Sequence, residues 1–153
     1  MDPYDTVAVQ RVWQRVNRSA AEQQGSADAA VLAELIRHEM AARQGYERML
    51  RSAGRHGPLL RQMALQEREH ARQLRGLFFL LYGTQPRVEA PPAQPAAPFA
   101  QSLRRAHGEE LNSAARYRQA AERWPEHSDF FLDLSRQEQQ HAANLRRIAA
   151  QLP

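Results

Sequence analysis

The chain has 153 residues, of which 42% are hydrophobic and 25% charged, so it is long enough for one domain with a single core. It contains no cysteine, which excludes disulfides, thiolate zinc sites, iron–sulfur clusters and cysteine nucleophiles. The net charge is +4, but the basic residues are all arginines interleaved with glutamates, without the basic run or stripe that favours nucleic-acid binding.

The first predicted element is a short amphipathic helix over residues 5–20. Its apolar residues recur at helical spacing, namely Val9, Val12, Trp13 and Val16. The sequence QQGSAD at 23–28 then predicts a break. We therefore interpret residues 1–24 as a separate helix that packs on the rest of the protein or on a partner, such as a second copy in a homodimer.

Two long helices are predicted next, from about Asp28 to Ala53 and from there, across a turn at 54–58, to about Tyr82. Pro58 suits the first position of the second helix. The longest apolar run, residues 77–82, is far too short to span a membrane. Because the N-terminus also lacks the pattern of a signal peptide, we expect a cytoplasmic protein without a membrane segment.

A proline-rich segment, GTQPRVEAPPAQPAAP at 83–98, predicts an extended linker. A third helix follows over 99–124 and stops at Pro125. A fourth covers 128–151 and begins at Ser128 or Asp129, both of which are good capping residues. No segment alternates as a strand does, so the sequence predicts an all-α protein.

The two halves of the chain match at an offset of 71 residues without a gap. The matched identical pairs include Leu32 with Leu103, Glu39 with Glu110, Tyr46 with Tyr117, Gln66 with Gln137, Glu67 with Glu138, His70 with His141, and Leu74 with Leu145. Such a repeat indicates two similar helical hairpins, residues 28–83 and 99–152, related by an approximate two-fold axis.

The linker at 84–98 has the length that this arrangement requires. A two-fold axis makes the second and third helices parallel, so their connection must travel the length of the bundle. Helices of about 25 residues span roughly 37 Å, and fifteen residues of proline-rich chain reach about 45 Å. We therefore expect residues 28–152 to form a four-helix bundle with a long crossover between helices 2 and 3.

Each long helix also carries a carboxylate in its apolar stripe. In two helices a histidine follows three residues later and shares the face of the glutamate. The six residues are Glu39, Glu67, His70, Glu110, Glu138 and His141. Four buried carboxylates without a cation would repel one another. Two divalent metals would balance their charge, and one glutamate from each of two helices plus Glu-x-x-His from the other two is the ligand pattern of dimetal carboxylate bundles.

The donor types favour iron, with manganese as the alternative, because oxygen-rich sites with one imidazole per metal suit these ions. Tyr46 and Tyr117 follow Glu39 and Glu110 by seven residues. Their hydroxyls are placed either to contact the ligating carboxylates or simply to fill the core. Glu69 and Glu109 have no acidic partner at the offset of 71 residues, and we interpret them and the other histidines as surface or turn residues.

The pattern Glu39-x-x-Ala-x-x-x-Tyr46, EREH, Glu110-x-x-Ser-x-x-x-Tyr117 and EQQH resembles the rubrerythrin branch of the ferritin-like superfamily over about residues 28–152. The resemblance implies a bundle with two irons, one bound by Glu39 and His70 and the other by Glu110 and His141. Glu67 and Glu138 would bridge them. Members of this family reduce peroxide, oxidise Fe²⁺ or activate O₂.

Two departures from the family pattern affect the expected reaction. Full-length rubrerythrins carry a cysteine-ligated rubredoxin iron that supplies electrons, and this chain has no cysteine. They also place an additional glutamate where this chain has Ser113. We therefore expect a di-iron oxidoreductase for peroxide or O₂, involved in oxidative stress, with an external reductase. The alternatives are a ferroxidase that stores iron and a metal-free bundle for protein interaction.

Overall fold

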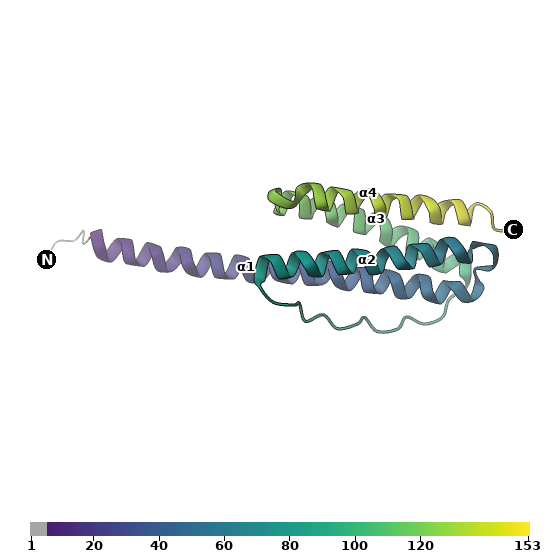
Figure 1. Ribbon diagram of the computed structural model, residues 1–153, viewed down its shortest axis with the longest axis horizontal. Coiled ribbons are helices and arrows are strands. Elements are labelled where there is room, and N and C mark those ends of the chain that lie inside the picture. Colours follow the sequence, from purple (N-terminus) through teal and green to yellow (C-terminus); the bar gives the residue numbers. More distant parts are fainter. Residues whose placement is uncertain (1–5) are drawn as a thin grey trace.

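The computed structural model describes residues 6–153, which form a four-helix bundle with one helix extending far beyond it (Figure 1). The helices are α1 (Thr6–Met49), α2 (Gly57–Tyr82), α3 (Phe99–Arg123) and α4 (Ser128–Ala149). Residues 6–153 contain no strand, so the predicted all-α class is confirmed. Within these residues, no helix has both the length and the apolar character that a membrane span requires.

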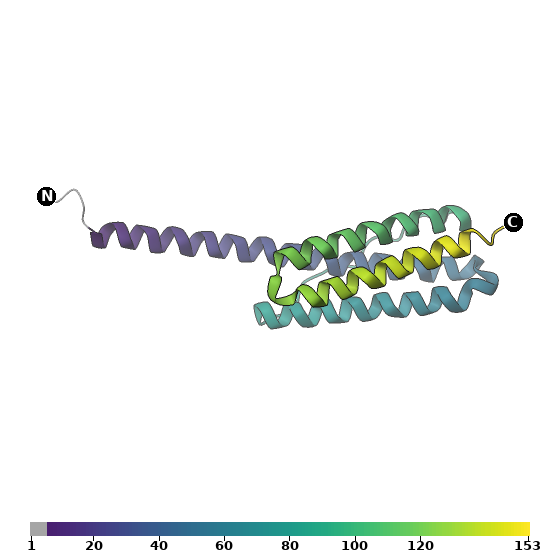
Figure 2. The same ribbon diagram turned by 90° about the horizontal axis from the view of Figure 1, so that it is seen from above.

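The bundle consists of two helical hairpins, α1 with α2 and α3 with α4 (Figure 2). Short 3-10 turns connect the helices of each hairpin, at Leu50–Ser52 and Gly54–His56 in the first and at Pro125–His127 in the second. The fourth helix begins at Ser128 as predicted, but His127 occupies the capping position and no side chain caps the helix. The predicted capping role of Ser128 or Asp129 is therefore wrong.

The connection between the hairpins is the predicted long crossover. Gly83 ends α2 in the left-handed conformation, with φ of 70°, and its N–H donates to the carbonyl oxygen of Phe79 at 2.8 Å. Glycine tolerates this conformation without steric cost. The segment 84–98 then runs along the bundle to the start of α3, so that α2 and α3 point the same way (Figure 1).

The predicted break at 23–28 is wrong, because α1 is continuous from Thr6 to Met49. Residues 23–28 contain no proline, and Gly25 alone costs a helix only about 1 kcal/mol. The helix recovers part of this cost through side chains, since Gln24 donates to Asp28 at 2.9 Å and Arg123 of α3 donates to the same carboxylate at 2.6 Å. What the sequence indicated as two helices is therefore one.

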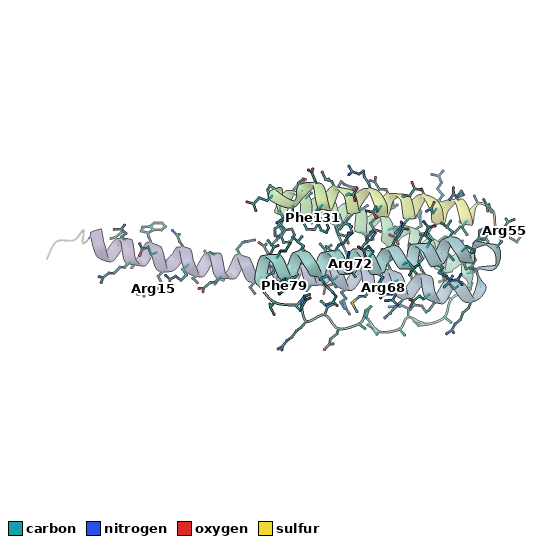
Figure 3. The ribbon with its side chains drawn as sticks, in the orientation of Figure 1. Arg15, Arg55, Arg68, Arg72, Phe79 and Phe131 are labelled. Carbon is teal, nitrogen blue, oxygen red and sulfur yellow. The ribbon has the colours of Figure 1, made fainter. Side chains whose placement is uncertain are left out.

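The N-terminal part of α1 does not pack on the bundle, contrary to one of the two predicted arrangements. It projects from the end where α2 and α3 finish, with Arg15 on the projecting part (Figure 3). The apolar side chains of its stripe are 50–62% exposed; they are Val9, Val12, Trp13 and Val16. The stripe predicted from the sequence thus exists, but nothing in the described chain covers it.

The core of the bundle is divided into two apolar clusters. One lies toward the projecting end of the bundle and includes Leu35, Leu77 and Phe131. The other lies toward the turns between α1 and α2 and includes Met49, Leu60 and Ile148. Between these clusters, every helix carries polar residues singled out in the sequence. The fold therefore encloses a polar layer between two apolar ones.

Candidate metal centre

Six polar side chains from all four helices meet in the layer between the two apolar clusters. Each has an exposed fraction of 2% or less; they are Glu39 of α1, Glu67 and His70 of α2, Glu110 of α3, and Glu138 and His141 of α4. The two Glu-x-x-His pairs share a face because three residues of α-helix advance by about 300°. The structure thus brings together all six residues predicted from the sequence.

The six side chains form two overlapping groups of four. The first contains Glu39, Glu67, His70 and Glu138, and the second contains Glu67, Glu110, Glu138 and His141. Within each group, one ligand atom per residue lies within 4.8 Å of all the others. Glu67 and Glu138 belong to both groups, so a metal ion held by either group would lie beside them.

The two histidines direct the same ring nitrogen toward the carboxylates. Nδ1 of His70 lies 2.9 Å from Glu138 Oε1, 3.1 Å from Glu67 Oε2 and 3.2 Å from Glu39 Oε2. Nδ1 of His141 lies 2.8 Å from Glu67 Oε1 and 3.3 Å from Glu138 Oε2. The rings face each other with centroids 5.8 Å apart. Both imidazoles therefore close the same cluster from opposite hairpins.

Several of these buried atoms make no hydrogen bond despite their close contacts. They are Glu67 Oε1, both carboxylate oxygens of Glu138, and Nδ1 of His141. Buried polar atoms are rarely left without a partner. Here they converge on a shared space without donor–acceptor alignment, which is the arrangement expected around a cation. Two groups of three carboxylates and one imidazole suit a hard or borderline divalent metal.

Burial and the neighbouring negative charges act in the same direction on the outer carboxylates, Glu39 and Glu110. Burial, together with the neighbouring carboxylates, raises the pKa of Glu39 and of Glu110 well above the usual value for glutamate. Removal from water disfavours an isolated negative charge, and a second carboxylate nearby adds repulsion. Without a metal, these two side chains are therefore favoured in their protonated forms.

In the shared carboxylates, Glu67 and Glu138, and in the two histidines, the charged form is favoured instead. Burial alone would raise the pKa values of Glu67 and Glu138, but the close contacts with both histidines outweigh it and hold these pKa values below the usual range. Burial also opposes a charged imidazole, yet the close carboxylates raise the pKa of His70 strongly and that of His141 to about 12. Without a metal, the shared carboxylates and the histidines thus favour their charged forms, whereas the outer carboxylates favour their neutral forms.

The two predicted tyrosines contact the outer carboxylates across the two-fold axis. The hydroxyl of Tyr117 donates to Glu39 Oε1 at 2.5 Å, and that of Tyr46 donates to Glu110 Oε1. Burial and the adjacent carboxylate raise the pKa of both hydroxyls well above that of free tyrosine. Each tyrosine therefore remains a donor and orients the glutamate of the other hairpin.

Sequence reasoning missed the role of two glutamines. Nε2 of His70 is 2.9 Å from Oε1 of Gln137, and Nε2 of His141 is 3.0 Å from Oε1 of Gln66. Both glutamines are only half-buried and resemble ordinary surface residues in the sequence. Their repetition at the offset of 71 residues was the signal that could have identified them.

The other polar residues considered in the sequence lie outside the two groups. Glu69 is partly exposed and accepts hydrogen bonds from Arg72. His38 is half-buried beside Arg116 in a groove between α1 and α3. Ser113, one turn after Glu110, belongs to neither group. The centre is therefore symmetric, with three glutamates and one histidine for each position.

The fold and the site define the class of this protein: it is a ferritin-like four-helix bundle with a buried cluster of glutamates and histidines. The chain matches the family described as Rubrerythrin over residues 30–149. It therefore belongs to the rubrerythrin family, as a ferritin-like domain. Searches among curated proteins and among solved structures found no match.

Proposed function

We propose that the chain is a non-haem di-iron protein that reduces peroxide or O₂ at the buried centre. The observation that supports it most is the pair of overlapping four-residue groups that share Glu67 and Glu138. One iron would be held by Glu39 and His70 and the other by Glu110 and His141. Manganese is the alternative metal, because the same donor set suits both ions.

The residues around the centre would prepare the ligands and exclude bulk water. The two apolar clusters close the polar layer on both sides along the bundle axis. The hydroxyls of Tyr46 and Tyr117 hold one oxygen of each outer glutamate and leave the second oxygen for a metal. Such contacts fix ligand orientation in metal sites generally. The protein would thus hold a buried and oriented ligand set before a metal binds.

Two ferrous ions at this centre would supply the two electrons that convert one peroxide molecule and two protons into two water molecules. A further cycle requires two new electrons. The 153 residues contain no cysteine, so no rubredoxin-type iron is available within them. We therefore propose that a separate reductase or electron carrier reduces the centre.

Anaerobic loading with Fe²⁺, followed by metal analysis, tests this function. We expect about two irons per chain, because each group can hold one ion and two divalent ions balance the charge of the four carboxylates. Separate mixing with O₂ and with peroxide, monitored by the absorbance of the ferric centre, then identifies the preferred oxidant from the faster reoxidation. A protein that takes up no iron under these conditions would contradict the proposal.

The substitutions Glu67→Gln and Glu138→Gln serve as the site variants of this experiment, with Glu69→Gln as the matched control. Glu69 is on α2, two residues from Glu67, but points to Arg72 at the surface. Loss of iron in the first two variants with retention in the third would support the centre. Equal iron content in all of them would favour the metal-free interaction bundle.

A ferroxidase that stores iron is the second candidate, favoured by the symmetry of the centre. The position of Ser113, where rubrerythrins have an additional glutamate, leaves both metal positions with equivalent ligands. The oligomeric state distinguishes the two functions. A mass measurement that gives a dimer, as we expect, argues against storage, whereas a closed shell of many chains would support it.

A further inference from the structure

The contacts between the two glutamines and the two histidines cross from one hairpin to the other. Gln137 of α4 contacts His70 of α2, and Gln66 of α2 contacts His141 of α4. In the offset repeat each glutamine directly precedes the shared glutamate of its own helix. The pair is therefore a reciprocal, two-fold-related feature, and each histidine depends on a side chain from the opposite half of the protein.

The chemistry of the amide determines which nitrogen of each ring carries hydrogen. The atom that faces each Nε2 is the amide oxygen, which can only accept a hydrogen bond. Nε2 must therefore be protonated and donate. In a neutral imidazole the other nitrogen, Nδ1, then carries the lone pair. In both histidines Nδ1 is the atom that faces the carboxylates, at 2.9 Å or less from the nearest oxygen.

We propose that Gln66 and Gln137 are positioning residues that select the Nδ1-coordinating form of the two histidines. This inference rests on the proposed metal function. Gln137 acts on the metal position of Glu39 and His70, and Gln66 acts on that of Glu110 and His141. Because the amide is neutral, it fixes the ring without adding a negative charge to a cluster that already contains four carboxylates.

The crossed contacts predict that loss of one glutamine weakens only one metal position, which a purely structural role in joining α2 to α4 would not produce. If the glutamines only linked α2 to α4, their removal would lower the stability of the whole protein and weaken both metal positions alike. If each one positions a single histidine, its removal weakens one metal position and leaves the other close to its original affinity. Loss of such a supporting contact typically lowers metal affinity by about ten- to a hundredfold.

Titration of the full chain with Co²⁺ distinguishes these possibilities, because its visible absorbance reports each bound ion. We expect two ions in the unaltered protein. In Gln137→Leu one ion should bind as before and the other about ten- to a hundredfold more weakly. Gln137→Glu, which keeps an oxygen acceptor in place, should restore the affinity. Gln140→Leu, on the exposed face of the same helix, is the control and should change neither ion.

A measurement on the unaltered protein keeps the proposal testable if Gln137→Leu does not fold. In the Zn²⁺-loaded, ¹⁵N-labelled chain, both histidines should show metal-bound Nδ1 and a slowly exchanging hydrogen on Nε2. Coordination through Nε2, or equal Co²⁺ affinities in Gln137→Leu and the unaltered protein, would overturn the inference while leaving the metal function intact. Failure of the unaltered protein to bind two ions would instead overturn both.

Discussion

The two kinds of glutamate in the centre differ in what their loss should do. Glu67 belongs to both four-residue groups, whereas Glu39 belongs to one. We predict that Glu67→Gln lowers the affinity for both metals and that Glu39→Gln lowers the affinity for one. Metal titration with Co²⁺ or Mn²⁺ measures this, and an equal effect of both substitutions would contradict the bridging position of Glu67.

The hydroxyl of Tyr117 is expected to stabilise the protein even without a metal. It donates to the buried Glu39, and its removal in Tyr117→Phe leaves a buried oxygen without its donor. The expected loss is about 1–3 kcal/mol in the free energy of unfolding. Denaturant unfolding of the metal-free protein measures it, with Tyr82→Phe as the control because Tyr82 is partly exposed. Equal stability of the two variants would contradict this role.

At the scale of single residues, the sequence predicted the members of the buried cluster well because burying a charge is costly. A glutamate in an apolar stripe requires a partner, so six positions were identified from periodicity and the repeat alone. The partners of Tyr46 and Tyr117 could not be assigned, since contacts across the two-fold axis depend on how the hairpins are placed. Gln66 and Gln137 were missed because half-buried polar residues on a helix have the same pattern as solvent-exposed ones.

At the scale of the helices, strong local signals gave correct boundaries and weak ones did not. Proline at positions 58 and 125 and Gly83 at the end of α2 left few alternatives for α2, α3 and α4. The segment at 23–28 contained only Gly25 as a strong helix-disfavouring residue, and its cost of about 1 kcal/mol is too small to interrupt a helix that continues on both sides.

The continuity of α1 leads to a prediction for Gly25. A Cβ atom added there has no neighbour within 4 Å, so Gly25→Ala introduces no clash. It should stabilise the projecting part of α1 by about 0.5–1 kcal/mol. Hydrogen exchange of residues 6–24 should therefore slow, with the bundle amides unchanged as internal control. Unchanged exchange in the projecting part would show that it is not helical across Gly25.

At the scale of the whole molecule, metal binding should be coupled to proton release. In the metal-free protein the raised pKa values of His70 and His141 favour imidazolium, and those of Glu39 and Glu110 favour carboxylic acid. All four groups must lose their protons to act as ligands. We therefore predict that protons are released as divalent ions bind.

This coupling fixes the sign of the pH dependence. Binding competes with protons, so the affinity rises with pH and is lost as pH falls. Calorimetric titration in buffers of different ionisation enthalpy counts the protons. An affinity that is independent of pH would contradict the protonation states described for the metal-free centre.

The central claim is that six side chains from four helices hold two metal ions between the two apolar clusters. Anomalous diffraction from a crystal of the iron-loaded protein, recorded at the iron absorption edge, tests it most directly. The account predicts two strong peaks, one beside Glu39 and His70 and one beside Glu110 and His141, with Glu67 and Glu138 between them. A structure without iron peaks at this position, or with these side chains turned toward solvent, would contradict it.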